Sequence, residues 1–134
     1  MRKILVAIGD EKSLDKCMNI AIPIASAFDA SITGVHVVPP LPRSFVLLLR
    51  QPWRKNARKI AEQYLEKAQK LCEDKNIQFE KKILNGLPRE EIVNYAKNNY
   101  DLIVIGRADW GSRLLGSVSS GVVHGAKTSI LLVN

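Results

Sequence analysis

The chain is poor in the residues that build metal and redox sites. Its 134 residues include two cysteines and two histidines. Cys17 and Cys72 lie far apart, outside any CxxC spacing, and neither His36 nor His124 has a carboxylate or cysteine at ligand spacing. We therefore expect two small buried thiols, a hydrogen-bonded strand histidine at position 36, a helix-end histidine at position 124 and no metal site.

Long apolar runs are missing as well. No stretch approaches the ~20 apolar residues that a membrane-spanning helix needs. The first apolar run is short and ends in charged Asp10-Glu11-Lys12 instead of a small-residue cleavage site. This pattern predicts a cytoplasmic protein without a transmembrane segment. A length of 134 residues, with 46% hydrophobic and 25% charged residues, predicts one globular domain over residues 1–134.

Acidic residues are fewer than basic ones, and the formal net charge is +7. Such a charge favours anionic partners in general without naming one. A basic cluster stands beside Trp53 and comprises Arg54, Lys55, Arg58 and Lys59. Nucleic acid or anionic lipid could contact it, but a solvated helix start is the commoner explanation, and we do not expect a nucleic-acid partner.

Apolar strand patterns alternate with segments of helical periodicity. Strands are predicted at Lys3–Ile8, Ile32–Val38, Ile77–Leu84, Leu102–Ile105 and Ile130–Val133, and helices after Ser13, over Ala57–Lys75, from Pro88 and from Gly116-Ser117 to Lys127. Ser13 is the predicted cap of the first helix. The run Leu102–Ile105 is continuously apolar, as in a central strand of a parallel sheet. This alternation predicts an α/β layered sheet with helices on both faces.

One segment does not fit an amphipathic surface. Phe45–Leu49 holds five consecutive apolar residues between Arg43 and Arg50. Their burial would contribute about 8 kcal/mol at ~1.5 kcal/mol each, too much to leave exposed in a soluble monomer. The segment follows the second strand, so we interpret it as a mobile lid, a short helix or hairpin that packs on its own domain or on a dimer mate. The alternative is a membrane-surface or partner-docking patch.

Two enzyme signatures are incomplete. The glycine spacing from Gly106 to Gly111 is that of a P-loop, but the lysine that reaches the terminal phosphates is missing. The run Ser117–Gly121 has serine at the first glycine position of a nucleophile elbow. Gly121 and Gly125 are better explained by close packing of the last helix on the sheet.

Five segments, taken together and in this order, resemble the universal stress protein family. They are Lys3-Ile-Leu-Val-Ala-Ile, Gly34-Val-His-Val-Val, Gly86-Leu-Pro-Arg-Glu-Glu-Ile-Val, Asp101-Leu-Ile-Val-Ile-Gly and Leu114-Leu-Gly-Ser-Val. The resemblance implies a five-stranded parallel sheet in the order 3-2-1-4-5 and a homodimer formed through the C-terminal strand. That strand, Ser129–Val133, also reads as an apolar sheet edge without a charged residue, and such edges are usually covered.

Part of this family binds ATP through Gly, two residues, Gly, nine residues, and Gly followed by Ser or Thr. In this chain the pattern starts at Gly106, has Asp109 at the second glycine, and closes at Gly116-Ser117 with only six residues between. Asp109 adds a side chain and a negative charge where a backbone must approach phosphate closely. The aspartate that helps hold the nucleoside in the family matches Gly9, with Asp10 displaced by one.

The resemblance implies a binding module for an adenine nucleotide, ATP or AMP, at the carboxyl end of the sheet, with Mg only alongside ATP and a role in stress response. A helix start that follows a strand and a polar loop also offers N–H groups to an anion. The candidate residues are Ile8, Gly9, Asp10, Val37, Gly106, Arg107, Asp109, Gly116, Ser117 and Val118. No acid, base and nucleophile are evident, although slow ATP hydrolysis stays open. The alternative is a dimeric protein-interaction or regulatory subunit that has lost nucleotide binding.

Overall fold

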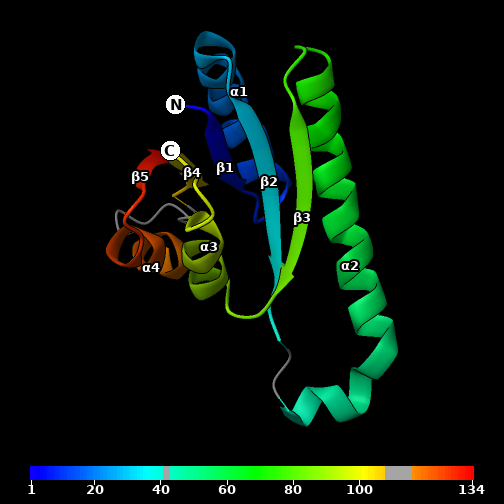
Figure 1. The fold of residues 1–134 in the computed structure, drawn as a ribbon. Coiled ribbons are helices and arrows are strands. Elements are labelled where there is room, and N and C mark those ends of the chain that lie inside the picture. The colour runs from blue at the N-terminus through cyan, green and yellow to red at the C-terminus, as the bar shows by residue number, and fades with distance from the viewer. Residues whose placement is uncertain (41–42, 108–115) are drawn as a thin grey trace.

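The fold is a single parallel sheet between two layers of helices. The computed structural model describes residues 1–40, 43–107 and 116–134, and for residues 43–54 it describes the backbone alone. The strands are β1 (Lys3–Ala7), β2 (Ser31–Val38), β3 (Phe79–Asn85), β4 (Leu102–Gly106) and β5 (Ser129–Val133), and the helices are α1 (Glu11–Phe28), α2 (Arg43–Glu73), α3 (Pro88–Ala96) and α4 (Ser117–Gly125). The strands pair in parallel in the order β3-β2-β1-β4-β5, as predicted (Figure 1).

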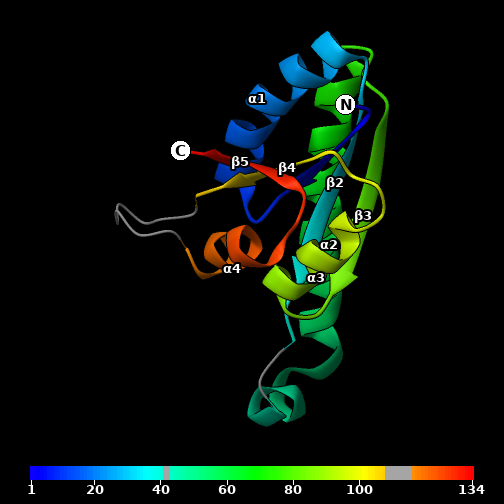
Figure 2. The same cartoon turned by 60° about the vertical axis from the view of Figure 1, so that its left-hand side comes forward.

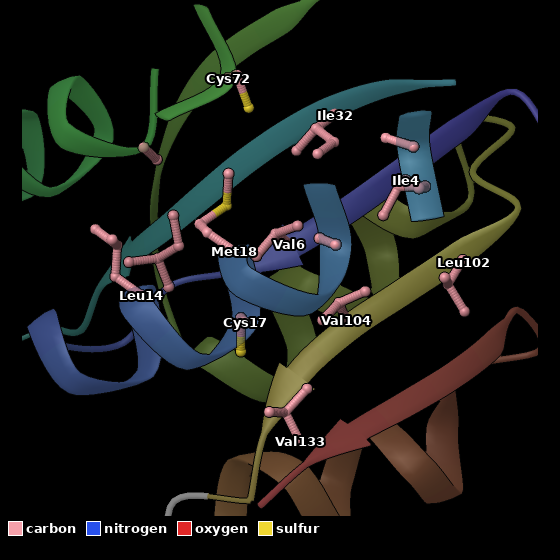
Figure 3. Packing of buried hydrophobic residues seen from close by; sticks show 14 of the residues in the cluster. Ile4, Val6, Leu14, Cys17, Met18, Ile32, Cys72, Leu102, Val104 and Val133 are labelled. Carbon is pink, nitrogen blue, oxygen red and sulfur yellow. The ribbon is translucent and has the colours of Figure 1, made fainter. Parts of the chain in front are cut away.

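Alternate residues of the central strands feed two separate cores, because successive side chains of a strand point to opposite faces. Ile4 and Val6 of β1 pack under α1 and α2, whereas Leu5 and Ala7 pack under α3 and α4. Figure 2 shows the helix pairs on opposite sides of the sheet. In Figure 3, Met18 of α1 lies close over Val6, at the centre of the first core. β1 and β4 are thus covered on both faces, as their continuous apolar sequences predict.

Both cysteines belong to the core under α1 and α2. Cys17 and Cys72 are free thiols with no exposed surface. Burial, and after it the negative charge of Asp10, raises the pKa of the Cys17 thiol to about 11. Burial, with Glu73 second, raises the pKa of the Cys72 thiol to about 12. The prediction of two small buried residues is confirmed.

Helix α2 begins earlier than predicted. It is one helix of 31 residues, Arg43–Glu73, and its first turns reach past the arrowheads of β2 and β3 (Figure 1). The backbone of Phe45–Leu49 is therefore helical and continuous with the rest of α2. The prediction of a separate short helix or hairpin is wrong in this respect. Whether the segment acts as a lid depends on side chains outside the described residues and stays a prediction. None of the helices, so far as they are described, is long and apolar enough to cross a membrane.

The two glycines of the last helix mark a close approach, as predicted, but they meet α3 and not the sheet. A Cβ atom added at Gly121 would lie 2.8 Å from Cβ of Arg89, and one at Gly125 would lie 3.4 Å from Cγ2 of Val93. Both neighbours are residues of α3. The partner was predicted wrongly because glycine spacing shows that something comes close without showing what.

Gly34 of β2 gives a test of the packing on the α1/α2 face. A Cβ atom there would lie 2.6 Å from Cζ of Phe79, so this half-buried ring would have to shift. We expect Gly34→Ala to lower the free energy of unfolding by about 1–3 kcal/mol, measured by denaturant titration. The matched control is Gly9→Ala, where the added atom would meet Ser13 Oγ at 3.9 Å, and its effect should stay within about 0.5 kcal/mol. Equal stability of the two variants would contradict this packing.

Candidate functional site

The strand order brings the predicted residues to one edge of the sheet. β1 lies between β2 and β4, so the carboxyl ends of these three strands are neighbours. Ile8, Gly9 and Asp10 follow β1, Val37 lies near the end of β2, Gly106 and Arg107 end β4, and Gly116, Ser117 and Val118 begin α4. Asp109 lies outside the described residues.

The turn from β1 into α1 is held by a reciprocal cap. The Ser13 N–H donates to Oδ1 of Asp10 at 2.7 Å, while Ser13 Oγ accepts from the N–H groups of Gly9 at 3.2 Å and Asp10 at 3.1 Å. Asp10 is therefore the N-cap, and the prediction of Ser13 in that role is wrong. Asp10 has extended backbone, which lets the helix begin one turn earlier. One carboxylate oxygen of Asp10 is thereby engaged with α1.

The end of β4 is joined to the starts of both α1 and α4. A Cβ atom at Gly106 would lie 3.3 Å from Cβ of Ser13, so glycine lets β4 end against the first turn of α1. The Gly106 carbonyl accepts from Oγ of buried Ser119 at 2.6 Å. The Arg107 carbonyl accepts from the Gly116 N–H at 3.2 Å. These contacts fix the start of α4 beside the end of β4.

The N-terminus of α4 presents backbone donors. Gly116 is its N-cap, and within the described part of the chain no side chain caps this helix. The first N–H groups of a helix have no partner inside it, and here they belong to Ser117 and Val118. Together with the partial positive charge of the helix end, such groups can bind an anion. Arg107 itself turns toward the C-terminus, with Nη1 3.4 Å from Oδ1 of Asn134.

β2 continues beyond the end of β1. Their paired register stops at Ala7 and Val35, whereas β2 pairs with β3 as far as Val38. The Ile8 N–H still donates to the Val35 carbonyl at 2.9 Å. Val37, two residues further, turns its own N–H and C=O to the same side. These two groups therefore point to the side of β1 at a level where β1 has already ended.

His36 lies at this point. Its Nδ1 is 2.7 Å from the Ile8 carbonyl oxygen, and the Tyr64 ring from α2 meets it edge-on with centroids 5.7 Å apart. The prediction of a hydrogen-bonded strand histidine is confirmed. The sequence did not indicate that its partner would be the residue following β1, nor that Ser119 would bond to Gly106. Both are contacts to backbone carbonyls, which no residue pattern marks.

A metal site requires several ligating side chains close together. Among residues 1–40, 43–107 and 116–134, no three His, Cys, Asp or Glu side chains gather to form a metal site. The Ser120 carbonyl accepts from Nδ1 of His124 at 2.7 Å within α4. It ends that helix, as predicted.

Fold and site together define an α/β domain in which a helix N-terminus lies at the switch point of a parallel sheet, a place where ligands of such sheets commonly bind. A family model described as "Universal stress protein family" matches residues 1–134. The chain belongs to the universal stress protein family.

Sequence relatives agree with this assignment. A universal stress protein of Methanocaldococcus jannaschii is 33% identical over 133 residues, which cover 93% of this chain and 76% of that protein. The universal stress protein YxiE of Bacillus subtilis is 31% identical over 148 residues, covering 98% of this chain and 97% of YxiE.

Solved structures share the fold. UspA from Lactobacillus plantarum superposes with a TM-score of 0.82 at 23% identity, covering 99% of this chain and 97% of UspA. An Arabidopsis thaliana family protein with AMP bound has a TM-score of 0.73 at 23% identity, covering 99% and 91%. The Archaeoglobus fulgidus protein in complex with dAMP has a TM-score of 0.75 at 18% identity, covering 100% and 98%.

The cap at Asp10 can be tested directly. Asp10→Ala removes the acceptor of the Ser13 N–H, so we expect a loss of about 1 kcal/mol in the free energy of unfolding. Asp10→Asn keeps an oxygen acceptor and should lose much less. Denaturant unfolding of both variants beside the wild type measures this, and equal losses would mean that the side-chain oxygen is not the stabilising group.

Proposed function

We propose that this domain binds an adenine nucleotide, ATP or AMP, at the carboxyl ends of β1, β2 and β4, and acts as a binding module in stress response. The observation that carries the proposal is the backbone of Val37. Its N–H and C=O lie side by side past the end of β1. Adenine offers an acceptor, N1, next to a donor, N6, which matches such a pair in spacing and polarity.

The start of α4 supports the same proposal. In the proposed complex, the N–H groups of Ser117 and Val118 bind the phosphates, and Gly116, which has no side chain, lets the phosphates approach the backbone closely. Mg²⁺ enters only with ATP, held by phosphate oxygens and water, because Mg²⁺ in nucleotide sites keeps several waters and few protein ligands. Relatives of the same fold that carry AMP or dAMP make a nucleotide of this kind the natural ligand to test.

Position 9 affects how tightly a nucleoside is held. The resemblance to the family places a carboxylate here, and this chain has Gly9. Among the described residues, an added Cβ would meet only Ser13 Oγ, at 3.9 Å, so an aspartate has room. The neighbouring carboxylate of Asp10 cannot fully replace it while one of its oxygens accepts from Ser13.

Isothermal titration with AMP, ADP and ATP, each with and without Mg²⁺, tests the proposal, with GTP as the matched control. We expect a Kd for the adenine nucleotides at or below about 1 mM, which corresponds to a binding free energy of at least about 4 kcal/mol in magnitude. Gly9→Asp should tighten it, because the carboxylate can accept from ribose hydroxyls. Absence of heat up to millimolar adenine nucleotide would exclude this function.

The second candidate is a protein-interaction or regulatory subunit that has lost nucleotide binding. It is favoured by Gly9, by the engagement of Asp10, and by Asp109 at a glycine position of the family pattern. The double variant Gly9→Asp/Asp109→Gly distinguishes the two. New ATP affinity in this variant, when the wild type has none, supports the second candidate, whereas affinity in the wild type supports the first.

Either function involves a homodimer formed through β5 in this proposal. β5 is the last strand of the sheet, and Ile130, Leu131 and Leu132 are only half-buried. The Arg107 N–H donates to the Val133 carbonyl, so Leu132, one residue earlier, turns its N–H away from β4. That N–H is available to an antiparallel twin strand.

Light scattering at micromolar concentration should give twice the mass of the chain. Leu132→Pro removes the outward N–H without removing a bond to β4 and should yield a monomer. Circular dichroism of this variant checks that the fold is retained. A wild-type monomer would contradict the dimer.

A further inference from the structure

We infer that His36 is a positioning residue: it holds the Ile8 carbonyl away from β2 and so keeps the Val37 N–H available for a base. The ligand half of this inference rests on the proposed function. The structural half, that His36 ends the hydrogen-bond ladder between β1 and β2, does not.

Backbone bonds along β2 show which way Val37 faces. Toward β1, the Ser31 N–H donates to Arg2 and the Val35 carbonyl accepts from Ile8, both at 2.9 Å. Toward β3, the Ile32 N–H donates to Gln78 at 2.9 Å and the Val38 carbonyl accepts from Gly86 at 3.1 Å. Along β2, the N–H and C=O groups of odd-numbered residues thus point to β1, and those of even-numbered residues point to β3, as in any parallel ladder. Val37 belongs to the side of β1.

The next bond of a continued ladder would run from the Val37 N–H to the Ile8 carbonyl. The described backbone does not contain this bond, and the Ile8 carbonyl oxygen lies 2.7 Å from Nδ1 of His36 instead. A carbonyl oxygen has no hydrogen to give, so Nδ1 carries the proton and donates. The side chain of His36 is on the α1/α2 face, because Val35 and Val37 lie in the opposite core. The Ile8 carbonyl is therefore directed out of the sheet.

Two neighbours hold the imidazole and Ile8 in this arrangement. Tyr64 of α2 meets the ring at an interplanar angle of 66°. Gly34, two residues before His36 on the same face, leaves space for the Ile8 side chain, whose Cδ1 is 3.3 Å from the position of an added Cβ. Contacts on the α1/α2 face thus hold the turn after β1 in place, independently of any ligand.

Amide hydrogen exchange of the ligand-free protein tests the structural half. In the wild type, the Val37 amide should exchange at least about tenfold faster than the Val35 amide, since only the latter lies within the paired register. His36→Leu should slow exchange at Val37 at least about tenfold as the ladder extends to Ile8. His36→Asn, whose amide nitrogen stands close to the Nδ1 position, should behave like the wild type. A Val37 amide as protected in the wild type as Val35, or unchanged by His36→Leu in a folded variant, overturns the inference.

Calorimetric titration of the same variants with AMP tests the ligand half. We expect His36→Leu to weaken AMP binding at least about tenfold, which is about 1.4 kcal/mol, and His36→Asn to restore it. Unchanged affinity in His36→Leu overturns this half. If the wild type does not bind AMP, the proposed function fails, while the exchange measurement still decides what His36 does. If His36→Leu does not fold, the wild-type comparison of Val37 with Val35 decides it alone.

Discussion

The candidate binding edge depends on a difference in length between two neighbouring strands. β1 stops pairing at Ala7, whereas β2 runs on to Val38 with β3 beside it. Within the described part of the chain, this offset leaves the Val37 backbone without a partner in β1 at the centre of the sheet, where a parallel fold already gathers its loops. Had β1 been longer, its backbone would pair with these groups of β2 and the ladder would continue.

The elements around these strand ends are joined to one another by few contacts. Ser13 contacts the turn after β1 through its hydroxyl and lies against Gly106 at the end of β4. Ser119 then joins that same strand end to α4. A substitution of either serine would therefore alter contacts between two elements. Such a connected frame favours a site that exists before its ligand arrives, which lowers the entropy lost on binding.

Much of the fold could be predicted because its signals are local and repeated. β1 and β4 are short apolar runs, and the helices after Pro88 and Gly116 begin at recognisable residues. The start of α2 could not be predicted from the sequence, because Pro52 and the apolar run before it interrupt the helical pattern. At the site, positions of residues followed from the parallel order, but Ser13 was assigned the role of Asp10 because each can cap a helix. The uses of Val37, Ser119 and the Ile8 carbonyl depend on backbone groups, which every residue carries.

The two buried thiols bear on how this protein meets oxidants. With pKa values of about 11 and 12, Cys17 and Cys72 hold their protons at neutral pH, and the thiolate is the form that reacts with peroxides, disulfides and alkylating agents. They also point from α1 and α2 into the core, out of reach of such reagents. The two cysteine thiols of the folded chain are therefore unreactive toward these reagents. Covalent labelling of Cys17 or Cys72 would therefore report that α1 or α2 has separated from the sheet.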